Sequence, residues 1–308
     1  MMRGNHLYKK DDNRYLNTRM LKPVTVCIAV LASVGTDFPQ IIFCADRLVT
    51  SGIQFEGGEP KIKKITDYCF AMQSSTDSLA ADIILEQVKN KMISSTKPVK
   101  IRDIVEILRN ECIAYKEEYL ERTVLAKYNL VFESVGVTPE SIVHQAVNEV
   151  GKHQYPLGCD FIVFGLEPSG EAHIFQVNQD AEYRLQDSQG FCTIGSGGWL
   201  AYLEMTKHGY ARNFPAIVAI PRVYIAKRIS ERAEGVGRNT DLAVLYFTNG
   251  IKEAEFKPAV FNLSHPDFLK KLDDAYEAIR ASEKVELEKI SKTVLEMLTP
   301  PKSEPAKN

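Results

Sequence analysis

The segment KPVTVCIAVLA, residues 22–32, has a single hydroxyl, that of Thr25, at the front edge of an apolar β-type run. A threonine hydroxyl is a weak nucleophile at neutral pH unless a nearby base accepts its proton. When threonine is the first residue of a chain, its own α-amine, with an ordinary pKa of about 7.7–8.0, serves as that base. Thr25 is therefore a candidate nucleophile. The alternative is an ordinary β-branched residue that begins a buried strand.

Motifs for metals, phosphates and organic cofactors are absent from the sequence. The six histidines are scattered, and no HExxH motif or His/Cys pair at zinc-ligand spacing occurs. The GSGG motif at 195–198 is not followed by the Lys-Ser/Thr pair of a phosphate-binding loop. We therefore expect no metal ion and no organic cofactor.

The composition indicates a soluble globular protein: 308 residues, 44% hydrophobic and 25% charged. A formal net charge of −2 provides no strong field for nucleic acid or an anionic membrane. The six cysteines lie mostly inside apolar runs, which favours reduced thiols and a cytoplasmic location. No apolar stretch reaches about 18 residues, and the first 20 residues lack the apolar core of a signal peptide.

Strand-rich blocks alternate with pairs of helices along the chain. Helices are expected near 74–93, 101–130, 139–150, 198–208, 215–232 and 266–298, with Leu79, Ile83, Leu85 and Val88 at roughly helical spacing in the first. Strands are expected at 24–32, 40–45, 61–65, 68–73, 159–167, 171–178, 181–185, 241–250 and 251–256. The segments SGIQFEGGEP and FCTIGSG are interpreted as loops, and Trp199 and Tyr202 as packing residues.

This order of elements predicts an α+β fold in which two antiparallel sheets pack face to face and helices cover each outer side, a four-layer αββα sandwich. We expect a flexible leader at 1–23 and one domain at 24–257, with an insertion at about 127–156. A C-terminal helical extension and tail would occupy 258–308. Apolar residues between Leu269 and Met297 recur every three or four positions, so this helix either binds a partner or packs on its own domain.

Five short motifs in this order resemble the proteasome family of N-terminal-nucleophile hydrolases, over Val24 to Phe256. They are TVCIAV (25–30), IIFCADRLVTSG (41–52), PKIKKI (60–65), CTIGSGGWLAYLEM (192–205) and DLAVLY (241–246). The resemblance implies the four-layer αββα fold and a threonine nucleophile. It also implies assembly with further copies of the chain, with a ring as one form.

The resemblance also implies individual roles. Thr25 matches the nucleophile, Asp46 the acidic residue, Lys61 the lysine and Ser196 the serine of the Gly-Ser-Gly loop. Thr50 matches the turn that holds an extended substrate, and the oxyanion loop falls on the segment that ends at Ser75. A lysine ammonium beside the threonine lowers the pKa of hydroxyl and amine, and a carboxylate orients that ammonium.

Four departures from the family's pattern argue against activity. Thr25 is not the first residue of the encoded chain, and Val24 stands where active members carry glycine, which tolerates the strain of self-cleavage. The family's supporting Asp and Ser fall on Ala233 and Val236. The glycine expected in the oxyanion loop is replaced within 73–75.

Three functions therefore remain open. The first is a threonine hydrolase that cuts peptide or other amide bonds, acting in proteolysis once Thr25 is the N-terminal residue. The second is a non-catalytic structural subunit or binding scaffold with the same fold. The third is a hydrolase of small amides that uses the same nucleophile.

Overall fold

The computed structural model describes residues 25–35, 39–51, 53–56, 60–76, 78–93, 99–152, 158–248 and 257–298. Within these ranges the chain forms two five-stranded antiparallel sheets, a separate two-stranded hairpin and six α-helices. The predicted α+β class is confirmed, as are two antiparallel sheets. Within the described ranges no helix is long and apolar enough to cross a membrane.

The first sheet has the strand order β10-β1-β2-β11-β12. Strand β1, inside the sheet between β10 and β2, is buried along its whole length, which explains why the segment is an unbroken apolar run. Strand β1 pairs with β10 on one side and with β2 on the other. Strand β11 pairs with β2, and β12 pairs with β11. The bounds are β1 (Cys27–Ala32), β2 (Gln40–Asp46), β10 (Phe191–Ile194), β11 (Thr240–Thr248) and β12 (Lys257–Asn262).

The second sheet has the order β5-β6-β7-β8-β9, with every neighbouring pair antiparallel. A hairpin of β3 and β4 follows directly after β2 and belongs to neither sheet. The bounds are β3 (Leu48–Ser51), β4 (Ile53–Glu56), β5 (Ile62–Lys64), β6 (Cys69–Ser75), β7 (Cys159–Leu166), β8 (Ala172–Val177) and β9 (Tyr183–Leu185).

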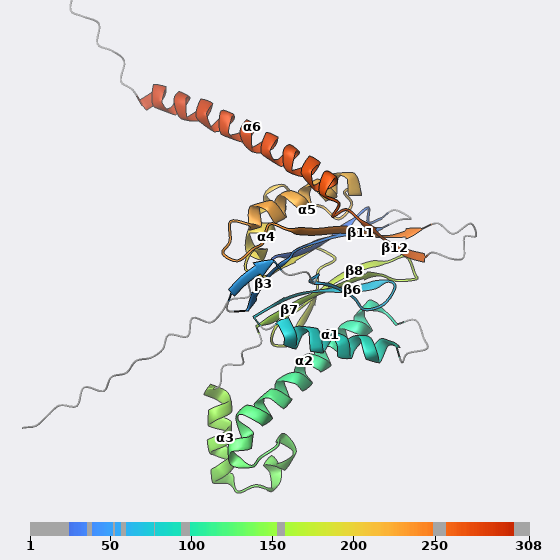
Figure 1. Cartoon of the computed structure of the whole chain (residues 1–308), viewed down its shortest axis with the longest axis vertical. Coiled ribbons are helices and arrows are strands. Elements are labelled where there is room, and N and C mark those ends of the chain that lie inside the picture. Colours follow the sequence, from blue (N-terminus) through green and yellow to red (C-terminus); the bar gives the residue numbers. More distant parts are fainter. Residues whose placement is uncertain are drawn as a thin grey trace, which may run out of the picture.

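The two sheets pack face to face, and helices cover both outer faces (Figure 1). Between the sheets, the rings of Phe43 and Phe164 lie 4.8 Å apart, with Phe70 against both. Alternate residues of β1 serve different layers: Ile28 contributes to the core under the helices and Ala29 to the core between the sheets. Helices α4 (Gly198–Lys207) and α5 (Ala216–Ser230) cover the first sheet, and α1 (Ser78–Ile93) and α2 (Ile101–Thr123) the second.

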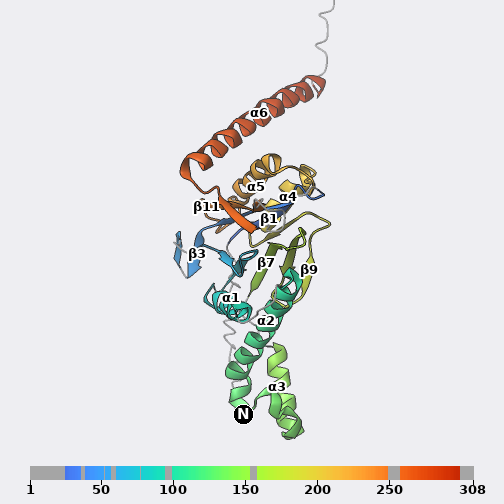
Figure 2. The same cartoon turned by 90° about the vertical axis from the view of Figure 1, so that its right-hand side faces the viewer.

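A small helical excursion leaves the sandwich after α2 (Figures 1 and 2). It consists of two short 3-10 helices, η1 (Leu125–Tyr128) and η2 (Phe132–Val137), and of α3 (Glu140–Lys152). Leu125, Leu130 and Ala146 form a satellite core there. The excursion lies where the insertion was expected from the sequence.

The last helix, α6 (Pro266–Leu298), packs on the domain from its first turns to Tyr276, which is buried beneath the guanidinium of Arg228. Phe268, Leu269 and Leu272 join the core beneath α5. Farther along, Leu287 and Ile290 are 63% and 58% exposed, and the helix extends away from the sheets (Figures 1 and 2). The first part of the helix therefore packs on its own domain, and partner binding by the exposed part stays a prediction.

Several strand predictions need correction. FCTI was interpreted as a loop but forms β10, because its residues complete the edge of the first sheet beside β1. IQFE was also interpreted as a loop but forms β4, where the alternation of Ile53 and Phe55 with polar residues fits a strand. The strand expected at 251–256 lies outside the described residues, and the partner of β11 is 257–262, inside the expected C-terminal extension.

Predictions about packing were also wrong in places. Leu79 is exposed and Ile83 is partly exposed, because α1 turns Ala80, Ala81 and Ile84 toward the second sheet instead. Trp199 was expected to pack but is 65% exposed on α4. All six cysteines are buried and free, as their apolar surroundings indicated.

Candidate active site

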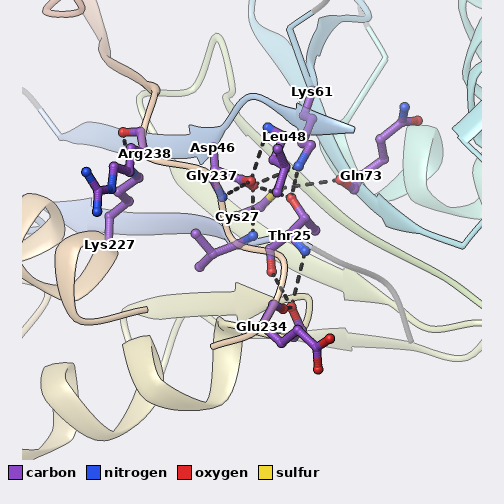
Figure 3. A network of polar contacts seen from close by, with 12 residues as sticks. Thr25, Cys27, Asp46, Leu48, Lys61, Gln73, Lys227, Glu234, Gly237 and Arg238 are labelled. Atoms are coloured by element: carbon purple, nitrogen blue, oxygen red, sulfur yellow. Dashed lines mark hydrogen bonds and ion pairs between the residues drawn. The ribbon is translucent and has the colours of Figure 1, made fainter. Parts of the chain in front are cut away.

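Thr25, Asp46 and Lys61 meet where β1 begins and β2 ends (Figure 3). Antiparallel pairing of these strands matches Cys27 with Ala45, which places the head of β1 beside the end of β2. Lys61 comes just before β5 and reaches the same point from the second sheet. Thr25 is 2% exposed, Asp46 is fully buried and the Lys61 side chain is 11% exposed. The three side chains predicted from distant segments therefore form one buried group.

Both oxygens of the Asp46 carboxylate accept hydrogen bonds. Oδ1 accepts from the Thr25 hydroxyl, from the Val26 amide at 2.9 Å and from the Lys61 ammonium at 2.7 Å. Oδ2 accepts from the Leu48 amide at 3.2 Å and from the Gly237 amide at 2.9 Å. Both oxygens are thus held by backbone donors, and the buried negative charge is paired with the ammonium.

The Lys61 ammonium also donates to the Thr25 hydroxyl oxygen. This contact puts a positive charge directly beside the only oxygen that the candidate nucleophile offers. A cation at this distance stabilises a developing alkoxide, and it does so more strongly in a buried site than in water. The hydroxyl proton is donated to Asp46 in this arrangement.

Ser196 lies at the backbone of Thr25. Its hydroxyl oxygen is 3.3 Å from the Thr25 nitrogen, which donates to it, and the Gly197 amide donates to the Thr25 carbonyl at 3.0 Å. Gly195 has φ +90°, and a Cβ there would lie 2.3 Å from the Thr25 carbonyl oxygen. Glycine is therefore required for this loop to approach the head of β1. The predicted serine is placed where it would contact a free α-amine.

The loop before β11, Ala233–Asn239, supports the site through its backbone. Gly237 donates its amide to Asp46, and the Glu234 carbonyl accepts from the Ser196 hydroxyl at 3.3 Å. Val236 is buried among apolar residues and Ala233 packs against the same core. At the two positions where the resemblance implied a supporting Asp and Ser, the side chains therefore contribute apolar packing in place of a charge or a hydroxyl.

Gly237 is a functional position that the sequence reasoning missed. A Cβ there would lie 2.7 Å from the Cβ of Leu48 and 3.3 Å from Oδ2 of Asp46. The signal in the sequence was the glycine of EGVGRN, but glycine in a loop is too common to be singled out. Arg47 was also missed; it joins β2 to β11 through a hydrogen bond from Nε to Asp241 at 2.9 Å.

The predicted substrate-binding residues lie in two different strands, β3 and β6. Thr50 is in β3, paired with Gln54, and its side chain lies outside the described residues. Ser75 ends β6 and pairs with Cys159. Just before it, Oε1 of Gln73 and the hydroxyl of Ser74 are buried and accept or donate no hydrogen bond within the described part of the chain.

A second nucleophile beside Thr25 is excluded by burial. Cys27 follows two residues later, and its thiol donates to the Gln73 carbonyl at 3.4 Å. Burial, the largest cause, raises the pKa of the Cys27 thiol to about 12, despite the opposing effect of the nearby Lys61 charge. A thiol with such a pKa is neutral at pH 7 and is not a nucleophile.

Among the described residues, one group of three side chains has the composition of a metal site: Glu167, Glu171 and His173, with ligand atoms within 4.8 Å of one another. His173 Nδ1 lies 2.6 Å from Asp187, and Glu167 accepts from the Ile101 amide at 3.1 Å. These bonds give the group a structural role, because they tie the β7–β8 turn to the start of α2. It lies at the end of β7 opposite to the end that pairs with Ser75.

Comparison with known proteins adds no further assignment. No protein-family model matches the chain. No curated protein matches it. The functional assignment is therefore carried by the side chains around Thr25.

Proposed function

We propose that the protein is a threonine hydrolase of the N-terminal-nucleophile class, with a proteasome-like αββα fold, which cleaves peptide or other amide bonds. One observation carries the proposal: the hydroxyl of Thr25 contacts both the Lys61 ammonium and the Asp46 carboxylate inside a buried site. A strand-initiating threonine with only a packing role has no need of a buried ion pair at its hydroxyl.

The reaction requires that the peptide bond between Val24 and Thr25 is hydrolysed first. That step consumes one water and frees the α-amine of Thr25. The freed nitrogen would remain near Ser196, whose hydroxyl lies 3.3 Å from it. An α-amine ordinarily has a pKa of about 7.7–8.0. The adjacent ammonium of Lys61 would lower the pKa of the Thr25 amine, so the amine can act as a base near neutral pH.

Amide cleavage then follows in two steps. The Thr25 oxygen attacks the substrate carbonyl while its proton passes to the α-amine, and the C–N bond breaks as the leaving amine takes that proton. The result is an ester between Thr25 and the acyl part of the substrate. Water attacks this ester, with the same amine as base, and releases the acid and the free hydroxyl. Backbone amides after Gln73 are the proposed oxyanion donors.

The test is covalent labelling of purified protein by an electrophile that traps N-terminal threonine, such as an epoxyketone, followed by intact-mass measurement. We expect a chain that begins at Thr25 and carries one adduct, and no adduct in Thr25→Ala. A chain that is never labelled and still contains residues 1–24 under all conditions would refute the hydrolase and support the scaffold function.

The scaffold function is the second candidate. It is favoured by the apolar character of Ala233 and Val236 and by β-branched Val24 at the bond to be cleaved. In a scaffold the Thr25, Lys61 and Asp46 group would only join the two sheets. A stable, full-length chain with no hydrolase activity is its expected signature.

We further propose that the protein assembles with copies of itself. Large apolar side chains on the outer side of α4 and α5 support this, since such exposure is typical of association surfaces. The exposed ones are Trp199, Tyr202, Leu203, Ile217 and Val218. Light scattering coupled to size exclusion measures the assembly, and a ring favours protein substrates, whereas a monomer or dimer favours small amides.

A further inference from the structure

Lys227 is a fully buried lysine on α5. Its side chain has no exposed surface and lies in the layer between α5 and the first sheet, among apolar residues such as Val223 and Ala226. Burying an ammonium is costly unless it is paired and fully hydrogen-bonded. A methionine or leucine would fill the same space without this cost, so the charge itself requires an explanation.

The ammonium of Lys227 has two acceptors. One is the carboxylate of Glu231, one helical turn later, at 2.5 Å. The other is the backbone carbonyl of Arg238, also at 2.5 Å. The second contact leaves the helix and reaches the 233–239 loop (Figure 3).

The residue next to Arg238 contacts the candidate active site. The Gly237 amide donates to Oδ2 of Asp46 at 2.9 Å, and Asp46 in turn accepts from Lys61 and Thr25. At the other end of the same loop, the carbonyl of Glu234 accepts from Ser196. One short loop therefore supplies backbone groups to both Asp46 and Ser196.

Several contacts share in holding this loop. The side chains of Ala233 and Val236 pack in the apolar core, and the Thr240 hydroxyl donates to the same Arg238 carbonyl at 3.0 Å. The Asn239 carbonyl accepts from the Arg47 amide at 3.2 Å, which fixes the loop where β11 begins. Lys227 adds a charged donor, because its ammonium binds the Arg238 carbonyl next to Gly237. Glu231, which is bound to Arg228 as well, keeps the ammonium in place.

We propose that Lys227 is a positioning residue for the Thr25 site. Its buried ammonium holds the Arg238 carbonyl, and thereby the Gly237 amide, so that the Asp46 carboxylate keeps its orientation toward Lys61 and Thr25. The effect of Lys227 on reactivity rests on the proposed function. The contact between Lys227 and the 233–239 loop is a property of the fold and can be measured separately.

The first experiment compares labelling kinetics of Lys227→Met with those of the unchanged protein. Methionine keeps the length and apolar contacts of the lysine but removes the donor. We expect the maximal rate constant for labelling by the epoxyketone to fall by about tenfold to a hundredfold. The concentration for half-maximal rate should not change, because Lys227 does not touch the substrate.

The pH profile separates positioning from simple destabilisation. If Asp46 is held less firmly, the Lys61 ammonium lies less close to the Thr25 amine, and the pKa of that amine rises. The labelling profile of Lys227→Met should therefore move to higher pH. A lowered melting temperature with an unchanged rate constant and pH profile would overturn the proposal.

The second experiment is hydrogen exchange read by mass spectrometry, which requires no activity. We expect faster exchange of amides in 233–239 in Lys227→Met. The matched control is Lys207→Met on α4, which should leave this segment unchanged. The side chain of Lys207 is 62% exposed, and its ammonium lies 4.0 Å from Glu283. Equal protection of the segment in Lys227→Met and the unchanged protein would refute the grip on the loop.

A further variant covers the case in which Lys227→Met does not fold. Lys227→Gln retains an N–H donor for the Arg238 carbonyl without the charge, and we expect it to keep part of the loop's protection and part of the labelling rate. If the unchanged protein is never labelled, the proposed function fails. The exchange result still shows whether Lys227 holds the 233–239 loop. If it is labelled and both Lys227 variants match its rate, the positioning role fails and the function stands.

Discussion

The ammonium nitrogen of Lys61 lies 2.7 Å from Oδ1 of Asp46, and the same ammonium donates to the hydroxyl of Thr25. The threonine and the lysine are 36 positions apart in the chain and arrive from different sheets. Placing a cation, an anion and a hydroxyl together in a buried site costs desolvation energy. The catalytic role that we propose for the hydroxyl would account for such an arrangement.

Thr25→Ala tests the nucleophile itself. We expect complete loss of labelling and of amide hydrolysis, with little change in secondary structure, because the strand that follows Thr25 is held by its own pairing with β2 and β10. Thr25→Ser is the matched control, since it keeps a hydroxyl. Activity in Thr25→Ala equal to that of the unchanged protein would place the chemistry elsewhere.

Val24→Gly tests the cleavage that must precede catalysis. Glycine reaches strained backbone conformations that a β-branched residue resists, so the variant should be cleaved before Thr25 faster or more completely. Intact-mass measurement after expression gives the fraction of chains that begin at Thr25. A lower cleaved fraction than in the unchanged protein would contradict the assigned cleavage step.

Lys61→Met tests the role of the ammonium. We expect the labelling rate to fall by about a hundredfold or more, because the positive charge beside the hydroxyl is lost. Lys64→Met is the control: Lys64 is three positions away, more than half exposed and paired with exposed Asp67 at 2.7 Å. Similar losses in the two variants would show that the effect is not specific to the Thr25 site.

Asp46→Asn tests how much the fold depends on the carboxylate. The amide group of asparagine cannot accept all the hydrogen bonds that the two carboxylate oxygens receive from Val26, Leu48, Gly237 and Lys61. We expect the free energy of unfolding to fall by about 1–3 kcal/mol, measured by urea denaturation. Asp67→Asn, at an exposed ion pair, should change it by less than about 1 kcal/mol. Unchanged stability in Asp46→Asn would mean that these contacts are not formed in solution.

His173 predicts a pH dependence of stability. Its hydrogen bond with Asp187, the largest cause, raises the pKa of the imidazole above the ordinary value of 6.5. The pKa is thus higher in the folded than in the unfolded chain. The stabilisation is therefore fully present below about pH 6.5 and is lost as the pH rises through the folded-state pKa.

The measurement is an NMR titration of His173, together with urea unfolding at several pH values. Asp187→Asn should return the pKa of His173 toward its ordinary value and flatten the pH dependence of unfolding. A His173 pKa below 6.5 in the folded protein would contradict the ion pair.

Much of the layered arrangement was predictable from local patterns. Runs such as 161–166 and 242–247 are apolar over their whole length, which is typical of strands covered on both faces. The helix at 266–298 was predicted with its observed bounds because its apolar spacing and polar face persist for many turns. Where the pattern was short, as in FCTI, the strand was missed because four residues cannot show a period.

The site was predictable only in its side chains. Thr25, Asp46, Lys61 and Ser196 were named from short motifs, and the structure brings all four together. Gly237 and Lys227 were not named, because a loop amide and a buried lysine have no local signature. Their importance arises from contacts with residues more than ten positions away in the chain.

The sequence alone determined most of the longer strands and helices and which hydroxyl heads an apolar strand, because these properties depend on neighbours a few residues apart. The tertiary structure alone decided that the Lys61 ammonium faces that hydroxyl, that the amides of Val26, Leu48 and Gly237 hold Asp46, and that Lys227 donates to the carbonyl next to Gly237. Such contacts depend on strand pairing and sheet packing, which join residues that have no fixed relation along the chain.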